Sequence, residues 1–291
     1  MNELVDALKD KGFSNMEQDQ VLKTCLLLIG KNTTFELKNF NKKILKRLKT
    51  IGKKLQRAST MLQLLKTFSY AGYLSSAYIL SSLAYFYFLN PKMDKNDEEQ
   101  ALKFVRNAQI TSYFSSTTDT KLSAIAHSIK EARAFEAFNH NLAKHQTWPL
   151  KITNDAIEDM MCSSRHDRVF PILQILYPNL NYKTTIFHID HIYPKSKFKN
   201  ENEKLDKDFY ENHLYNLQLL EGQENSAKKD KDPEVWLKEE YKDNQQAIEE
   251  YKKRNYIDPN LKLEWENIKE FREKRKEVII KTLKEGLLPK S

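Results

Sequence analysis

The chain has 291 residues, a length that excludes peptide hormones and small disulfide-stapled proteins and is sufficient for two domains. Only 6 Gly and 8 Pro occur, so few residues interrupt helices and we expect a mainly α-helical fold. The two cysteines, Cys25 and Cys162, are too few for a disulfide framework and too far apart for a CxxC zinc site. The N-terminus lacks a basic-then-apolar export signal. We therefore expect a cytoplasmic protein.

Positive charge is concentrated in one stretch. The whole chain carries 48 Lys and Arg against 40 Asp and Glu, a balance that permits a polyanionic partner without requiring one. Residues 31–60 hold ten basic side chains and a single acid. Apolar residues repeat at spacings of four and three between Ile44 and Leu65, which predicts an amphipathic helix. Its polar face carries four lysines, here called the basic stripe, which either contact nucleic-acid phosphates or form a solvated surface: Lys42, Lys46, Lys49 and Lys53.

Residues 67–91 contain no charged side chain and are long enough to span a membrane. Five tyrosines and five serines are distributed through the segment rather than held at its ends. A membrane span would place these hydroxyl groups in hydrocarbon, which is costly. We expect a buried core helix and no membrane partner.

The domain organisation follows from breaks in the helical pattern. We expect a polar linker at 92–99, followed by helices over 101–108 and 121–138. A hydroxyl-rich run over 115–119 is suited to capping the second helix. Trp148-Pro149 interrupts the pattern, which predicts a helical region over 1–150 and a second domain over 165–291. We expect two further helices from Pro233 onward, separated at Asp258-Pro259.

One part of the second domain departs from the helical pattern. Residues 184–194 are rich in β-branched and aromatic side chains, which predicts a strand ending at Pro194. Residues 214–220 predict a second strand, and Glu221-Gly222 a turn. A short helix over 223–229 then carries Asn225 and Lys228. The predicted order is strand, loop, strand, helix.

The residues of this segment resemble a known nuclease motif. Asp190-His191-Ile192-x-Pro194, Asn216-Leu217 and Glu224-Asn225-x-x-Lys228 are similar to the ββα-metal core of HNH (His-Me finger) endonucleases. His191-Ile-Tyr-Pro194 with Asn216-Leu-Gln-Leu-Leu220 resembles more closely the C-terminal nuclease domain of GmrSD-type (type IV, modification-dependent) restriction enzymes, over about 165–287. The helical region before it is also similar to the region that precedes this domain in those proteins.

The resemblance implies a mainly α fold with a small embedded ββα-metal (HNH) motif. It implies a metal-dependent DNA endonuclease of anti-phage restriction, using Mg²⁺ or Mn²⁺, with DNA, including modified phage DNA, as substrate. The chemistry of the residues agrees, because phosphodiester hydrolysis needs an activated water and a cation beside the phosphate. An imidazole titrates near neutral pH and serves as a base, while carboxylate and amide oxygens suit Mg²⁺.

Each candidate residue receives a role. The resemblance implies His191 as the base, Asp190 and Asn225 as metal ligands, and Asn216 as the residue that fixes the loop carrying the histidine. We further expect Lys228 to contact a phosphate, His188 to support the metal from the strand face of Asp190, and Lys195 and Lys197 to contact nucleic acid.

Two alternatives remain open at this stage. The chain is either an active nuclease or a catalytically inactive subunit that binds DNA or a partner, and the intact Asp190, His191 and Asn225 favour the enzyme. We do not find the Asp-Gly-Gln-Gln-Arg signature of the ParB-like nucleotidase domain that accompanies this nuclease domain. The chain is therefore a truncated form, a fragment, or one half of a split system whose partner is a separate ParB-like nucleotidase subunit.

Overall fold

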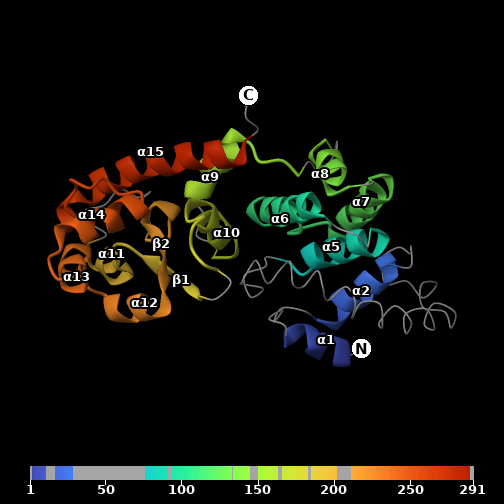
Figure 1. The fold of residues 1–291 in the computed structure, drawn as a ribbon, viewed down its shortest axis with the longest axis horizontal. Coiled ribbons are helices and arrows are strands. Elements are labelled where there is room, and N and C mark those ends of the chain that lie inside the picture. Colours follow the sequence, from blue (N-terminus) through green and yellow to red (C-terminus); the bar gives the residue numbers. More distant parts are fainter. Residues whose placement is uncertain are drawn as a thin grey trace. The chain divides into compact units, whose positions relative to one another are not determined.

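A computed structural model describes nine parts of the chain, namely residues 2–10, 17–28, 76–90, 94–132, 134–144, 150–162, 166–182, 185–201 and 211–288. The chain divides into two compact units, residues 1–151 and 152–291. The structure is mainly helical, as the sparse Gly and Pro predict (Figure 1). The basic stripe and the helix expected over 44–65 lie outside the described residues.

Helices pack around one apolar core in the first unit. α5 lies against α2 and α7, and α6 lies against α8. The helices in the described residues of this unit are α1 (Asn2–Lys9), α2 (Gln18–Leu28), α5 (Tyr78–Leu89), α6 (Lys95–Ile110), α7 (Thr118–Glu131) and α8 (Phe135–Ala143).

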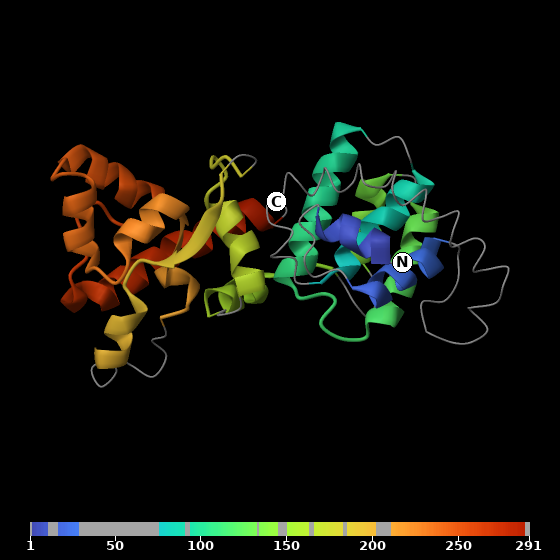
Figure 2. The ribbon, with the colours of Figure 1, turned by 90° about the horizontal axis from the view of Figure 1, so that it is seen from below.

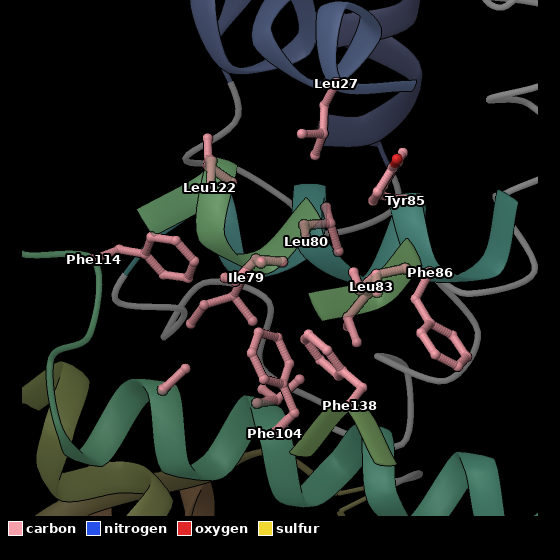
Figure 3. Close-up of a cluster of buried hydrophobic side chains, with 14 of the residues drawn as sticks. Leu27, Ile79, Leu80, Leu83, Tyr85, Phe86, Phe104, Phe114, Leu122 and Phe138 are labelled. Atoms are coloured by element: carbon pink, nitrogen blue, oxygen red, sulfur yellow. The ribbon is translucent and has the colours of Figure 1, made fainter. Parts of the chain in front are cut away.

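Aromatic rings from three helices fill this core (Figure 3). The ring of Phe138 lies 5.2 Å from that of Phe104 and 6.0 Å from that of Phe86, measured between centroids. The serines of α5 do not leave buried hydroxyls without partners, because Ser81 Oγ lies 2.7 Å from Thr24 Oγ1 and Ser82 Oγ donates to a backbone carbonyl. In the part described, residues 76–90, the uncharged segment contributes a core helix. None of the described helices combines the length and apolar character needed to cross a membrane.

Three local expectations for the first unit are wrong. The linker expected at 92–99 is largely helix, because Asp94 accepts a hydrogen bond from the backbone of Asp97 (2.8 Å) and so caps α6. The single helix expected over 121–138 is broken at Ala132, whose backbone is extended and whose side chain is buried. Core packing outweighs helix propensity there. Thr117 precedes α7 with a left-handed backbone (φ 52°) and makes no side-chain capping bond.

The second unit contains a two-stranded antiparallel sheet, β1 (Phe187–His191) and β2 (Leu217–Glu221). Figure 2 shows α11 (gold) leading out of the end of β1. The register places Asp190 opposite Gln218 and His191 opposite Leu217. The other elements that the structure describes in this unit are α9 (Asn154–Met161), α10 (His166–Leu176), α11 (Lys195–Glu201), η4 (Leu214–Asn216), α12 (Gly222–Lys228), α13 (Pro233–Glu240), α14 (Gln245–Arg254), η5 (Trp265–Asn267) and α15 (Ile268–Leu287).

The predicted order of strand, loop, strand and helix is observed, with shifted boundaries. Residues 214–216 form a 3₁₀ turn, so β2 starts at Leu217, and α12 follows Glu221 without a separate turn. The described stretch 211–288 contains three α-helices after residue 232 rather than the expected two. The extra break lies at Lys242 and Asp243, whose φ angles of 49° and 56° end α13 before Asn244 caps α14.

A buried arginine joins the last helix to the start of β2. Arg275 of α15 is 1% exposed. Its guanidinium donates to four backbone carbonyls, those of Leu214 (3.2 Å), Leu217 (2.8 Å), Asn255 (2.8 Å) and Tyr215. Three of these carbonyls belong to the 3₁₀ turn and the first residue of β2, and that of Asn255 belongs to the end of α14. α15 therefore fixes the position of the 3₁₀ turn that carries Asn216.

We expect Phe104→Ala to destabilise the first unit by about 3–5 kcal/mol, because the substitution removes a ring that is fully buried between α5 and α8. The matched control is Leu89→Ala, since Leu89 ends α5 with 42% of its surface exposed and should change stability by only about 0.5 kcal/mol. Urea denaturation followed by circular dichroism measures both. Equal losses in the two variants would contradict the core described here.

Candidate active site

The second unit brings the predicted site residues together where β1, β2 and α12 meet, since α12 contacts both strands (Figure 1). Successive side chains of a strand point to opposite faces. His188 and Asp190 therefore share one face of β1, and His191 ends the strand on the other. The candidate base and the candidate carboxylate are neighbours on one rigid element.

Asp190 is held by two buried donors. Its carboxylate oxygen Oδ2 accepts from Gln218 Nε2 at 2.9 Å and pairs with Lys228 Nζ at 3.0 Å. The Lys228 side chain is 1% exposed and also donates to the backbone carbonyl of His191. Within the described residues, Oδ1 of Asp190 makes no hydrogen bond or ion pair. One oxygen of the carboxylate is thus used by the protein, and the other is available to a ligand.

The Lys228 side chain is buried, unlike that of a lysine that contacts a phosphate in solvent. Its ammonium group is engaged by Asp190 and by the end of β1, so a phosphate contact would require the ammonium to leave both partners. In the arrangement observed, Lys228 holds the C-terminal end of α12 against β1.

His191 contacts a residue that the sequence did not indicate. Its Nε2 lies 2.9 Å from Asn212 Oδ1, and Asn212 Nδ2 donates to the carboxylate of Glu211 at 3.4 Å. Because a carboxylate accepts, the amide nitrogen of Asn212 faces Glu211 and its oxygen faces the imidazole. Nε2 then carries the ring proton, and the lone pair of Nδ1 remains for accepting another proton.

Burial favours the neutral form of the His191 imidazole. Burial lowers the pKa of His191 below its ordinary value, and the hydrogen bond to Asn212 and the charge of Asp190 offset part of that effect. Lys228 and Lys195 lower the pKa further. The ring is therefore neutral at pH 7, which is the form that a general base requires.

Asn216 ties both ends of the long loop between the strands. It is fully buried, and its Oδ1 accepts from the backbone N–H of Tyr193 at 2.9 Å. Its Nδ2 donates to the carbonyls of Tyr193 (3.0 Å) and Glu211 (2.9 Å), and its own carbonyl accepts from Ile192 N (2.8 Å). The backbone just after His191 is thus fixed to the segment that enters β2.

The other predicted residues lie around this centre. His188 is exposed and lies beside the first residue of α12, Gly222, at which an added Cβ would be 3.5 Å from its Nε2. The backbone of Asn225 falls within α12, and its side chain is outside the description. On α11, Lys195 Nζ lies 3.5 Å from Glu211 and Lys197 Nζ lies 3.2 Å from Asp232, with both lysine side chains partly exposed.

Three supporting residues were not predicted, namely Asn212, Gln218 and Tyr251. Gln218 lies inside the motif read as a strand, and a polar side chain opposite Asp190 in an apolar strand was a usable signal. Asn212 sits in a polar loop, and Tyr251 in a helix rich in Lys and Glu, where nothing in the sequence distinguishes them.

The donors present favour a particular kind of metal. Among the residues whose side chains are described, no three His, Cys, Asp or Glu gather to hold an ion. The site offers one carboxylate oxygen, Oδ1 of Asp190, beside α12, the helix on which Asn225 lies. Such a sparse set of oxygen donors suits an ion that keeps water and phosphate oxygens as its remaining ligands.

The chain was compared with known proteins. Residues 135–282 match a family described as GmrSD restriction endonucleases, C-terminal domain. The match begins at 135 rather than near 165, and so includes α8, and it contains β1, β2 and α12 together with all the candidate residues of the second unit. No curated protein matches the chain. The resemblance seen in the sequence is confirmed, and the chain belongs to the GmrSD restriction endonuclease C-terminal domain family.

Proposed function

We propose that the chain is a metal-dependent endonuclease that hydrolyses DNA phosphodiester bonds at an HNH-type ββα-metal site built by β1, β2 and α12. The observation that carries this proposal is the end of β1, where Asp190 keeps Oδ1 and His191 keeps Nδ1 without a partner among the described residues. A hard oxygen donor and a neutral imidazole are thereby placed next to each other. Membership of a restriction endonuclease family supports the same reaction.

Mg²⁺ or Mn²⁺ fits the donors of this site. Asp190 would supply one carboxylate oxygen, and Asn225 on α12 is proposed as an amide oxygen ligand. His188, on the strand face of Asp190, is proposed to support the ion. When bound, the ion neutralises charge on the phosphate and makes the attacking water more acidic.

The residues of the chain perform the remaining tasks. His191 accepts the proton of the attacking water at Nδ1, while Asn212 holds the other ring nitrogen. Asn216 fixes the backbone beside the histidine, so the base is positioned before substrate binds. Lys195 and Lys197 contribute positive charge at the start of α11, beside the site, where a DNA backbone would benefit from it.

A family of restriction endonucleases supports a setting for this activity. We propose that the enzyme acts in the cytoplasm in anti-phage restriction, on phage DNA that includes modified bases, together with a ParB-like nucleotidase partner. The rival function is an inactive subunit that binds DNA or a partner. In that case the protein would keep the candidate site residues but would not cut DNA. Measuring plasmid nicking by the wild-type protein distinguishes the two functions.

We expect His191→Ala to lower plasmid nicking in Mn²⁺ by roughly 10²–10⁴-fold, because it removes the base and leaves the proposed metal ligands. Asn225→Ala should instead weaken metal binding, so its nicking should recover in part at high Mn²⁺, whereas that of His191→Ala should not. The measurement is nicking rate against Mn²⁺ concentration, with an EDTA arm expected to abolish cutting.

The control for this experiment is His127→Ala, since His127 is an exposed histidine of α7 and should nick like the wild type. Circular dichroism checks that each variant is folded. Near-wild-type nicking by folded His191→Ala would refute the role of His191. A wild-type protein that binds DNA and never cuts it would favour the inactive subunit.

The basic stripe gives a separate expectation about DNA binding. Reversing Lys42, Lys46, Lys49 and Lys53 to Glu should weaken binding and reduce the slope of affinity against salt, because phosphate contacts release counterions. The matched control reverses four exposed lysines of the first unit, Lys95, Lys103, Lys130 and Lys151. Fluorescence anisotropy across a salt titration measures both. Equal salt slopes for the two variants would show that the stripe is a solvated surface.

A further inference from the structure

A chain of buried polar side chains runs from α14 through β2 to the candidate metal ligand. Tyr251 of α14 donates its hydroxyl to Gln218 Oε1 at 2.6 Å, and Gln218 Nε2 donates to Asp190 Oδ2 at 2.9 Å. Gln218 is fully buried and Tyr251 is 2% exposed. A buried amide in a strand whose other residues are mostly apolar is costly unless both of its ends are bonded, and here both are.

The chemistry of the two partners fixes the direction of this chain. An ionised carboxylate only accepts hydrogen bonds, so the amide nitrogen of Gln218 must face Asp190. The amide oxygen then faces α14 and needs a donor, which the Tyr251 hydroxyl supplies. Burial raises the pKa of Tyr251 well above its ordinary value, so the hydroxyl keeps its proton. Tyr251 thus satisfies the amide oxygen and holds the Gln218 side chain in the orientation that Asp190 requires.

The Gln218 amide donates its hydrogen bond to Oδ2 of the Asp190 carboxylate. The Gln218 nitrogen and the Lys228 ammonium converge on Oδ2 from β2 and from α12. Two donors on the same oxygen fix the rotation of the carboxylate about its last bond. Oδ1 is therefore held in one direction and stays free of protein partners among the described residues.

We propose that Gln218 and Tyr251 are positioning residues that hold Asp190 through Oδ2 and so present Oδ1 to the divalent ion. This inference rests on the proposed function, because it assumes that Asp190 binds that ion. Loss of the Tyr251 hydroxyl would leave the buried amide oxygen of Gln218 without a donor, so the amide would be held less firmly against Oδ2 of Asp190. Residues that orient metal ligands in this way typically change metal affinity by about 10–100-fold when they are replaced.

The test is direct Mn²⁺ binding to the full chain without DNA, measured by electron paramagnetic resonance of free Mn²⁺. Tyr251→Phe and Gln218→Leu should each raise the Kd for Mn²⁺ by about 10–100-fold. The double variant should bind no more weakly than Gln218→Leu alone, because the hydroxyl acts only through the amide. Gln218→Glu provides a second variant, since it still accepts from Tyr251 but places a carboxylate against Asp190, and it should also weaken binding.

The matched control is Tyr256→Phe, which removes a hydroxyl that donates to the backbone carbonyl of Leu176, away from Asp190. It should leave the Kd for Mn²⁺ unchanged, and an equal rise would overturn the inference by showing general loosening of the unit. Asp190→Asn tests the proposed metal site separately from the positioning role of Gln218 and Tyr251. If Asp190→Asn loses Mn²⁺ binding while Tyr251→Phe and Gln218→Leu bind as the wild type, the inference fails and the proposed metal site stands. If Asp190→Asn binds Mn²⁺ normally, the proposed metal site itself fails.

Discussion

The buried ion pair between Asp190 and Lys228 is the contact on which the arrangement of the site depends. A two-stranded sheet is marginal by itself, and this pair joins the end of β1 to the end of α12. The Lys228 side chain is 1% exposed and that of Asp190 is 12% exposed, so removing one partner would leave the other charge unpaired, at a cost of about 3–5 kcal/mol. The same ammonium binds the carbonyl of His191. One side chain therefore fixes both neighbouring site residues.

In each of the two candidate residues at the end of β1, one polar atom binds the protein and another is proposed to take part in the reaction. Asp190 uses Oδ2 and His191 uses Nε2 to bind the protein, which leaves Oδ1 and Nδ1 for a ligand and a proton. The support comes from segments far apart in sequence, namely the loop before β2, the strand β2 itself, and the helices α12, α14 and α15. This arrangement would preorganise the site for the proposed reaction, because the atoms proposed to react are held in place by the protein alone.

The sequence predicts the parts of this arrangement that depend on local pattern. β-branched and aromatic residues mark β1, and the order of strands and helix is read correctly. Local sequence pattern does not predict contacts between segments that are far apart in the chain. Arg275 looks like any cation of a helix rich in Lys and Glu, yet it is buried on four carbonyls. Lys228 is expected from the sequence to contact a phosphate, and its burial depends on packing of α12 that no spacing reveals. The break at Ala132 likewise follows from core packing against helix propensity.

The central claim is that a divalent ion binds Asp190 beside His191. Anomalous scattering from Mn²⁺ in crystals of the 291-residue His191→Ala protein tests this claim most directly, because that variant should bind the ion without cutting DNA. We predict a strong anomalous peak bonded to Oδ1 of Asp190, with Oδ2 still paired to Lys228. Mn²⁺ bound elsewhere in the chain, with the Asp190 carboxylate free of metal, would contradict the account.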